Sequence, residues 1–90
     1  MGKMTNKYGK IVITGTQIRG ARAMLGWSAK ELAERTGVVR NTIQRLEGFS
    51  DVPPSRTQSL LELRRVFEEA GIIFIDADDK HGPGVRLAKP

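Results

Sequence analysis

A short segment of the chain is rich in side chains that can each form paired hydrogen bonds with a flat polar partner. They are Arg40, Asn41, Gln44 and Arg45. A guanidinium group can donate two bonds to guanine, and a carboxamide can donate one and accept one from adenine. Ile43 and Leu46 recur at helical spacing, so a helix over residues 40–47 would bury these two and turn the polar side chains outward together. The alternative is an ordinary solvated helix surface.

Positive charge is concentrated in the half of the chain that carries this segment. The 90 residues have a net charge of +5, and residues 1–50 hold nine Lys or Arg against three Asp or Glu. Residues 51–90 hold six Lys or Arg against seven Asp or Glu. Such an imbalance favours a polyanionic partner, although charge alone does not separate nucleic acid from a merely solvated surface.

The composition excludes several other classes of protein. The chain has no cysteine, which rules out disulfides and thiolate metal sites. It has no apolar run close to the roughly 20 residues that span a bilayer, and the apolar stretch at 11–13 is too short for a signal-peptide core. We therefore expect a single small cytoplasmic domain with no membrane association.

Repeated start and stop signals predict four helices. Thr14 and Gln17 have the spacing of a capping box, as have Ser28 and Glu31, and a glycine closes each of these helices. The third helix lacks this signal, because Val39 stands where a polar N-cap is expected. The predicted helices run from after Thr14 to Gly26, from Ala29 to Gly37, from Arg40 to Glu47, and from Arg56 to Ala70 with Ser55 as the cap and Gly71 at the end.

After the fourth helix the pattern changes to that of strands. Residues 72–75 and 85–87 are short β-branched and apolar runs, and a loop rich in turn formers joins them. We expect a β-hairpin, which needs a helix or a second subunit to cover it. The predicted organisation is a flexible basic arm at 1–10, one domain at 11–71 and the hairpin at 72–90 as a candidate dimerisation element.

The segment from 25 to 47 reads LGWSAKELAERTGVVRNTIQRLE, and it resembles the Xre family of helix-turn-helix regulators, which includes the phage Cro and lambda-type repressors. The resemblance covers about residues 14–70 and rests on the capped helix after Ser28, on Leu32-Ala33, Gly37 and Ile43, and on Leu46-Glu47. It implies a mainly α, four-helix lambda-repressor-like domain that binds double-stranded DNA with the helix at 40–47 in the major groove. The function it implies is sequence-specific transcriptional regulation by a repressor, and from the hairpin we expect this repressor to act as a homodimer.

The resemblance also implies roles for individual residues. Base contacts fall to Arg40, Asn41, Thr42, Gln44 and Arg45. Apart from the resemblance, we expect phosphate contacts from Ser28 and Lys30 at the start of the second helix, and from Arg19. The free amides at the start of the second helix favour an anion there. Lys3, Lys7 and Lys10 of the arm would add non-specific attraction, and an ion pair between Arg22 and Glu47 is implied as a structural link.

Alternatives stay open at this point. The same scaffold could serve as a protein-interaction module, such as an antitoxin or an anti-activator. The hairpin could pack only on its own fourth helix, or it could pair across a two-fold axis to form the dimer.

Asp76, Asp78, Asp79 and His81 read as a solvated acidic turn without calcium-loop spacing, and no nucleophile or phosphate-loop motif is present. We therefore expect no metal, no cofactor and no enzymatic activity.

Overall fold

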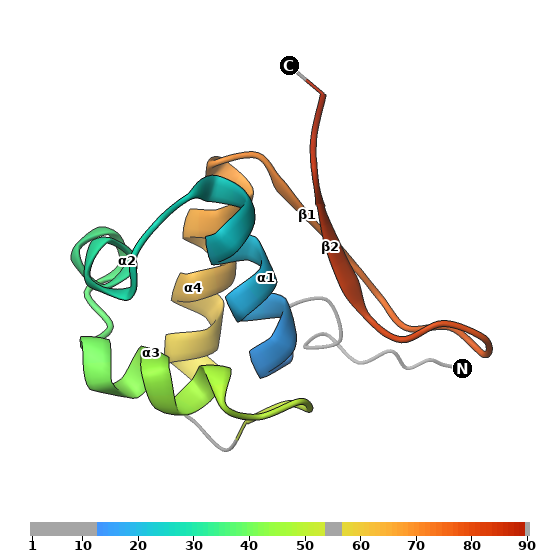
Figure 1. Ribbon diagram of the computed structural model, residues 1–90, viewed down its shortest axis with the longest axis horizontal. Coiled ribbons are helices and arrows are strands. Elements are labelled where there is room, and N and C mark those ends of the chain that lie inside the picture. Colours follow the sequence, from blue (N-terminus) through green and yellow to red (C-terminus); the bar gives the residue numbers. More distant parts are fainter. Residues whose placement is uncertain (1–12, 54–56, 90) are drawn as a thin grey trace.

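The computed structural model describes residues 13–53 and 57–89. It contains four helices and a two-stranded antiparallel sheet: α1 (Gly15–Leu25), α2 (Ala29–Thr36), α3 (Arg40–Glu47), α4 (Thr57–Glu69), β1 (Ile72–Ile75) and β2 (Gly84–Leu87). The predicted fold class, mainly helical with a C-terminal hairpin, is confirmed. The helices gather on one side of the molecule, and the hairpin runs past α1 and projects beyond them (Figure 1). Among the described helices, none combines the length and the apolar character needed to cross a membrane.

The first helices begin at the predicted caps. The Thr14 hydroxyl accepts a hydrogen bond from the Gln17 N–H at 3.0 Å, and Gln17 Oε1 accepts one from the Thr14 N–H at 2.9 Å, which completes a capping box. At α2 only half of the predicted box is formed. Ser28 Oγ accepts from the Glu31 N–H at 3.0 Å, while the Glu31 carboxylate turns instead to an ion pair with Arg35.

Two boundaries differ from the prediction by one residue. The fourth helix is described over Thr57–Glu69 and ends one residue before the predicted Ala70. Its predicted first residue Arg56 and its predicted cap Ser55 lie outside the described residues, as does the arm at 1–10. β2 starts at Gly84, one residue earlier than predicted, because this residue already pairs with the last residue of β1. A glycine carries no side-chain signal for a strand, so the sequence pattern could not include it.

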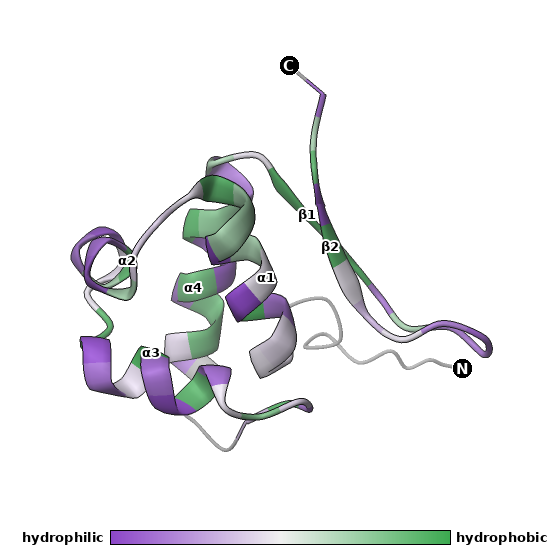
Figure 2. Ribbon diagram, viewed as in Figure 1, coloured by the Kyte–Doolittle hydropathy of each residue, from purple (hydrophilic) through white to green (hydrophobic). Residues whose placement is uncertain are grey.

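One hydrophobic core joins the helices to the hairpin. Its buried residues include Ile18, Leu32, Ile43, Leu46, Leu63, Phe67 and Ile72. Trp27, between α1 and α2, stacks on Phe67 with ring centroids 5.9 Å apart, and the Arg35 guanidinium lies 4.2 Å from the Trp27 ring centroid. A helix as short as α2 is marginal by itself in water, so its stability comes from this docking. Figure 2 shows the consequence for α3, whose ribbon is largely hydrophilic apart from the residues that enter the core.

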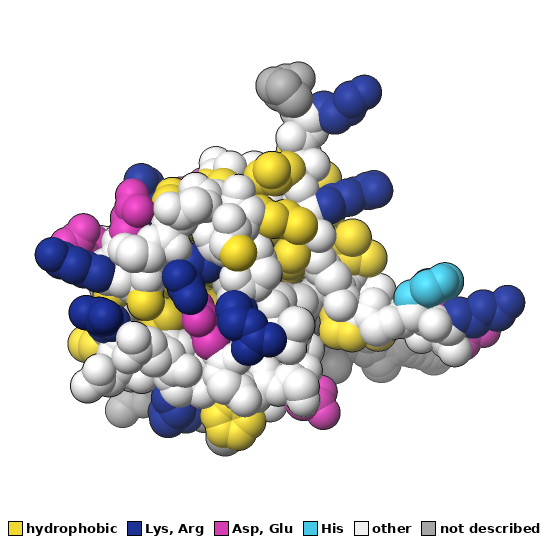
Figure 3. Space-filling view, viewed as in Figure 1, with side chains coloured by type: hydrophobic (Ala, Val, Ile, Leu, Met, Phe, Trp, Pro, Cys, Tyr) yellow, Lys and Arg dark blue, Asp and Glu magenta, His cyan; other side chains and the backbone are white. Residues whose placement is uncertain are grey.

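The hairpin has one covered face and one uncovered apolar face. Successive residues of a strand point to opposite sides, so Ile72 and Phe74 are buried against the helices while Ile73 and Ile75 face away. On the uncovered face Ile73 is 41% exposed and Ile75 is 40% exposed, and Arg86 of β2 lies opposite Ile73. Leu87, which is 51% exposed, pairs with Ile72 and so belongs to the other face. In the space-filling view, hydrophobic side chains gather where the hairpin lies beside α1 (Figure 3).

A single buried side chain ties the hairpin to α1. Gln17 is 5% exposed, and its Nε2 donates to the carbonyl of Gly84 at 2.9 Å and to that of Ile75 at 3.3 Å. These carbonyls belong to the last pair of the β ladder. One turn further along α1, a Cβ on Gly20 would stand only 3.3 Å from Cγ2 of Val85, so the absent side chain allows β2 to approach closely.

Candidate nucleic-acid interface

The turn between α2 and α3 is held by a glycine and a buried hydroxyl. Gly37 has a φ of 78°, a conformation that favours glycine, and its N–H donates to the carbonyl of Ala33 at 2.8 Å. The Thr36 hydroxyl donates to the Leu32 carbonyl at 2.8 Å and accepts from the Val38 N–H at 3.1 Å. The sequence pattern indicated Gly37 but missed Thr36. The available signal was a threonine just before the closing glycine, where its hydroxyl can bond back to the preceding turn.

α3 presents one buried and one exposed side. Ile43 and Leu46 are fully buried, so they fix the rotation of the helix about its own axis. Four of the five residues predicted to contact bases are exposed together on the other side: Arg40, Asn41, Gln44 and Arg45. The fifth, Thr42, is half-buried at the border of this exposed side. We call the exposed side the outer face of α3.

An ion pair anchors the end of α3 to α1. Glu47 is 7% exposed, and its carboxylate oxygens lie 2.7 Å from Nε and 2.9 Å from Nη2 of Arg22. The third guanidinium donor of Arg22 bonds to the Trp27 carbonyl at 3.0 Å. The hydrogen bond with Glu47 raises the pKa of Arg22 above its usual value. The predicted ion pair is thus confirmed as a link between helices.

The predicted phosphate-contacting residues fall into two places. Ser28 and Lys30 are exposed at the start of α2, where the first-turn amides have no partner within the helix and, among the described residues, only that of Glu31 is capped, by Ser28. Arg19 is exposed on α1, but its Nη1 donates to the carbonyl of Glu47 at 2.8 Å, so it satisfies one of the last carbonyls of α3. Its phosphate contact stays a prediction. Lys3, Lys7 and Lys10 lie outside the described residues.

Charge is arranged differently on α4 and on the α2–α3 side. On α4 the guanidinium of Arg65 pairs with Glu62 and Glu69, and these hydrogen bonds raise the pKa of Arg65. Over residues 13–53 and 57–89, by contrast, neither Lys30 nor Arg40 forms an ion pair. Basic side chains are spread over the part of the visible surface formed by α1, α2 and α3 (Figure 3). Arg65 on α4 is therefore neutralised by its neighbours, whereas Lys30 and Arg40 have no ion-pair partner among the described residues.

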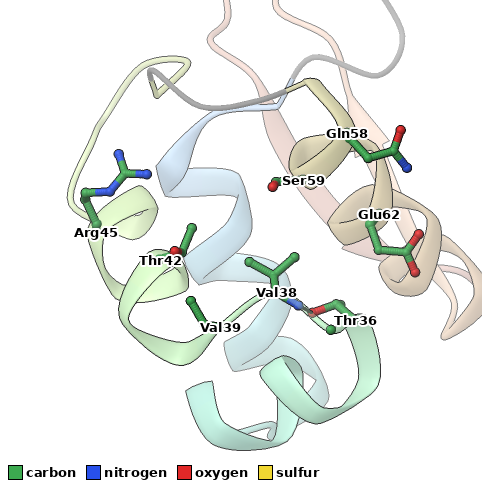
Figure 4. Close-up of a pocket in the computed structure, with 9 residues that line it drawn as sticks. Thr36, Val38, Val39, Thr42, Arg45, Gln58, Ser59 and Glu62 are labelled. Carbon is green, nitrogen blue, oxygen red and sulfur yellow. Dashed lines mark hydrogen bonds between the residues drawn. The ribbon is translucent and has the colours of Figure 1, made fainter.

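An open groove of about 660 Å³ runs between α3 and α4. Val39, Thr42 and Arg45 form one wall, Gln58, Ser59 and Glu62 form the other, and Thr36, Gly37 and Val38 lie at one end. Figure 4 shows the first three side chains following one another along α3, opposite those of α4. The groove thus borders the outer face of α3 along the length of the helix.

The acidic segment between the strands forms a turn. Asp78 Oδ1 accepts hydrogen bonds from the N–H groups of Lys80 at 2.8 Å and His81 at 2.7 Å, and these bonds lower the pKa of Asp78. His81 Nδ1 lies 3.0 Å from the same oxygen, and all of these side chains are exposed. In the described part of the chain, no three His, Asp or Glu side chains are grouped as metal ligands.

No known family model matches the chain, and no curated protein matches its sequence. The resemblance of residues 25–47 to Xre regulators therefore rests on the residues themselves. The features of the described residues that bear on function are the outer face of α3, the fixed turn that precedes it and the start of α2.

Proposed function

We propose that the protein is a sequence-specific transcriptional regulator, acting as a repressor in the cytoplasm, that binds double-stranded DNA with α3 in the major groove. One observation carries the proposal. Two arginines and two carboxamides are exposed together on a helix whose rotation is fixed by the buried Ile43 and Leu46. A single α-helix fits the major groove, and these side-chain types form the paired bonds that distinguish base pairs there.

The proposal assigns two kinds of contact. Arg40, Asn41 and Arg45 contact base edges, with Thr42 and Gln44 reaching bases or the adjacent phosphates. Ser28, Lys30 and Arg19 contact phosphates, which fixes the register of the protein on the duplex without selecting a sequence. The uncompensated charge of Lys30 and the free amides of the first turn of α2 support this second group.

We further propose that the protein acts as a homodimer through its hairpin. The face of the hairpin that points away from the helices exposes Ile73 and Ile75. A two-fold axis there would place two α3 helices on successive turns of the duplex, about 34 Å apart, over a pseudo-palindromic site. Sedimentation of the wild-type chain and of Ile73→Lys tests this, with a dimer expected for the first and a monomer for the second. A wild-type monomer at all concentrations would contradict the dimer.

Selection of bound duplexes from a random pool tests the main proposal. The wild-type protein should enrich one pseudo-palindromic site. Arg40→Ala or Arg45→Ala should each relax the preference at one position by about 1–3 kcal/mol of discrimination. Arg65→Ala removes the same charge from α4 and is the matched control, with no change in the selected sequence expected. Failure to enrich any sequence would contradict the proposal.

The same exposed hairpin residues favour a second candidate, a protein-interaction module. Salt dependence and partner capture separate the two candidates. A DNA-binding protein should lose affinity steeply with salt, and Lys30→Ala should reduce the slope of log K against log salt by about one. A stoichiometric protein partner, captured without any retained DNA, would instead support the interaction module.

A further inference from the structure

The Val39 side chain, at the start of α3, makes no contact on which the fold depends. It is the N-cap of α3, with φ −65° and ψ 148°, and no side chain there bonds to the first amides of the helix. It is 64% exposed, the largest value among the exposed large hydrophobic residues of the described chain. Its neighbour Val38 packs against the core, so the hydrophobic contact that fixes the entry to α3 is already made without Val39.

A polar residue would serve the helix better at this position. Thr14 and Ser28 show this at α1 and α2, where each hydroxyl accepts a bond from a first-turn amide. A single exposed valine is ordinary on a protein surface. This one, however, immediately precedes Arg40 and Asn41, at the end of α3 that the proposed function directs to the bases. Sites that break a local rule of stability are the places where function is expected to act on the choice of residue.

We infer that Val39 reads the C5 methyl group of a pyrimidine, in unmodified DNA a thymine, next to the base pair contacted by Arg40 or Asn41. The inference rests on the proposed function. In the major groove the thymine methyl is the one apolar group on a base edge, and side-chain methyl groups are its natural partners. Valine offers two methyl groups on a side chain with a single, restricted rotatable bond, so little freedom is lost when the contact forms.

The position of Val39 within the row along α3 supports this reading. Val39, Thr42 and Arg45 form one wall of the groove beside the outer face, with Val39 at the leading end (Figure 4). Arg45, and Arg40 next to Val39, supply donors suited to guanine. The Val39 side chain cannot form a hydrogen bond. The α3 entry thus combines polar readers with one apolar reader.

Replacing thymine by deoxyuridine tests the inference, since the change removes only the methyl group. Each thymine of the selected site is replaced in turn, and affinity is measured for three proteins. The affinity of the wild type should fall about four-fold when deoxyuridine replaces one particular thymine of a half-site, which is the equivalent of one buried methyl group. Val39→Ser should bind the thymine and the deoxyuridine duplexes equally. Val39→Thr keeps one methyl group and should retain the preference for thymine over deoxyuridine. Cytosine and 5-methylcytosine at that position show whether a methylated cytosine can replace thymine as the source of the methyl group.

A stability measurement keeps the test independent of folding defects. Val39→Ser supplies a capping hydroxyl and should raise the melting midpoint by about 4–8 °C, so a lost thymine preference cannot be blamed on unfolding. The inference is overturned if Val39→Ser keeps the full preference for thymine, or if no thymine of the site responds to deoxyuridine. If the wild type selects no sequence at all, the proposed function itself fails, which is a different result.

Discussion

α1 and α3 carry the same kinds of polar side chain and use them in opposite ways. On α1, Gln17 is buried and bonded to three backbone groups, and Arg22 is bonded to a buried carboxylate. On α3, Gln44 and Arg40 are exposed on the outer face. Residue type therefore does not decide whether an arginine or a glutamine is structural, but the buried partners around it do. Matched substitutions on the two helices can test this difference.

The largest effect is expected where α1 touches the end of α3. A Cβ on Gly15 would overlap the backbone carbonyl oxygens of Leu46 and Phe49, and neither can move without shifting the chain. Gly15→Ala should cost about 3 kcal/mol or more of unfolding free energy, measured by urea denaturation with Trp27 fluorescence. Gly48→Ala, on the ordinary right-handed backbone at the end of α3, is the control and should change stability little. Equal effects of the two would contradict this packing.

The next largest effect compares an arginine on each helix. Arg22→Ala leaves the Glu47 carboxylate, with 9% side-chain exposure, without its partner, and should cost about 2–3 kcal/mol of unfolding free energy. Arg40→Ala should stay within about 0.5 kcal/mol in the same assay, because no buried group depends on it. A loss on α3 as large as that on α1 would show that Arg40 is structural.

A smaller effect separates the two glutamines. Gln17→Glu keeps the capping acceptor but turns a carboxylate oxygen toward the carbonyls of Ile75 and Gly84, where the amide now donates. We expect a loss of about 2 kcal/mol, from a buried acceptor facing acceptors. Gln44→Glu makes the same chemical change on the outer face of α3 and should be nearly neutral for stability, while under the proposed function it should weaken DNA binding. A neutral Gln17→Glu would mean that the bonds from Gln17 to the hairpin carbonyls contribute little to stability.

The smallest effect concerns the helix caps. Thr14→Ala removes the hydroxyl that accepts the Gln17 N–H and should cost about 1 kcal/mol. Val39→Ala should be close to neutral, since there is no cap at α3 to lose. Thermal unfolding followed by circular dichroism measures both. A destabilised Val39→Ala would indicate a packing role for this side chain that its exposure does not suggest.

Much of the fold could be predicted because its signals are local. Helix starts at Thr14 and Ser28, the stop at Gly37 and the inward spacing of Ile43 and Leu46 each depend on residues within a turn of one another. The outer face of α3 followed from the same spacing. Val39 was likewise recognised from sequence as a missing cap.

What could not be predicted depends on contacts between distant parts of the chain. Gln17 was identified only as a capping residue, yet its amide reaches carbonyls 58 and 67 residues away. The bond from Arg19 to the Glu47 carbonyl depends on how α1 crosses α3, which no local pattern contains. For the same reason the sequence indicated a cationic residue at 19 but not that α3 already engages it.

The polar contacts of α1 connect the hairpin to the end of α3. Gln17 bonds to the loop end of the β ladder, while Arg19 and Arg22 bond to the end of α3, all within one helix of 11 residues. In a dimer joined by its hairpins, the distance between the two α3 helices would be set by the two α1 helices, each bonded to both the hairpin and α3, and not by flexible segments. Inserting one base pair between the half-sites would then rotate one half-site about the duplex axis by about 35°, and the bonds that hold α1 to both neighbours would oppose a matching rotation of α3.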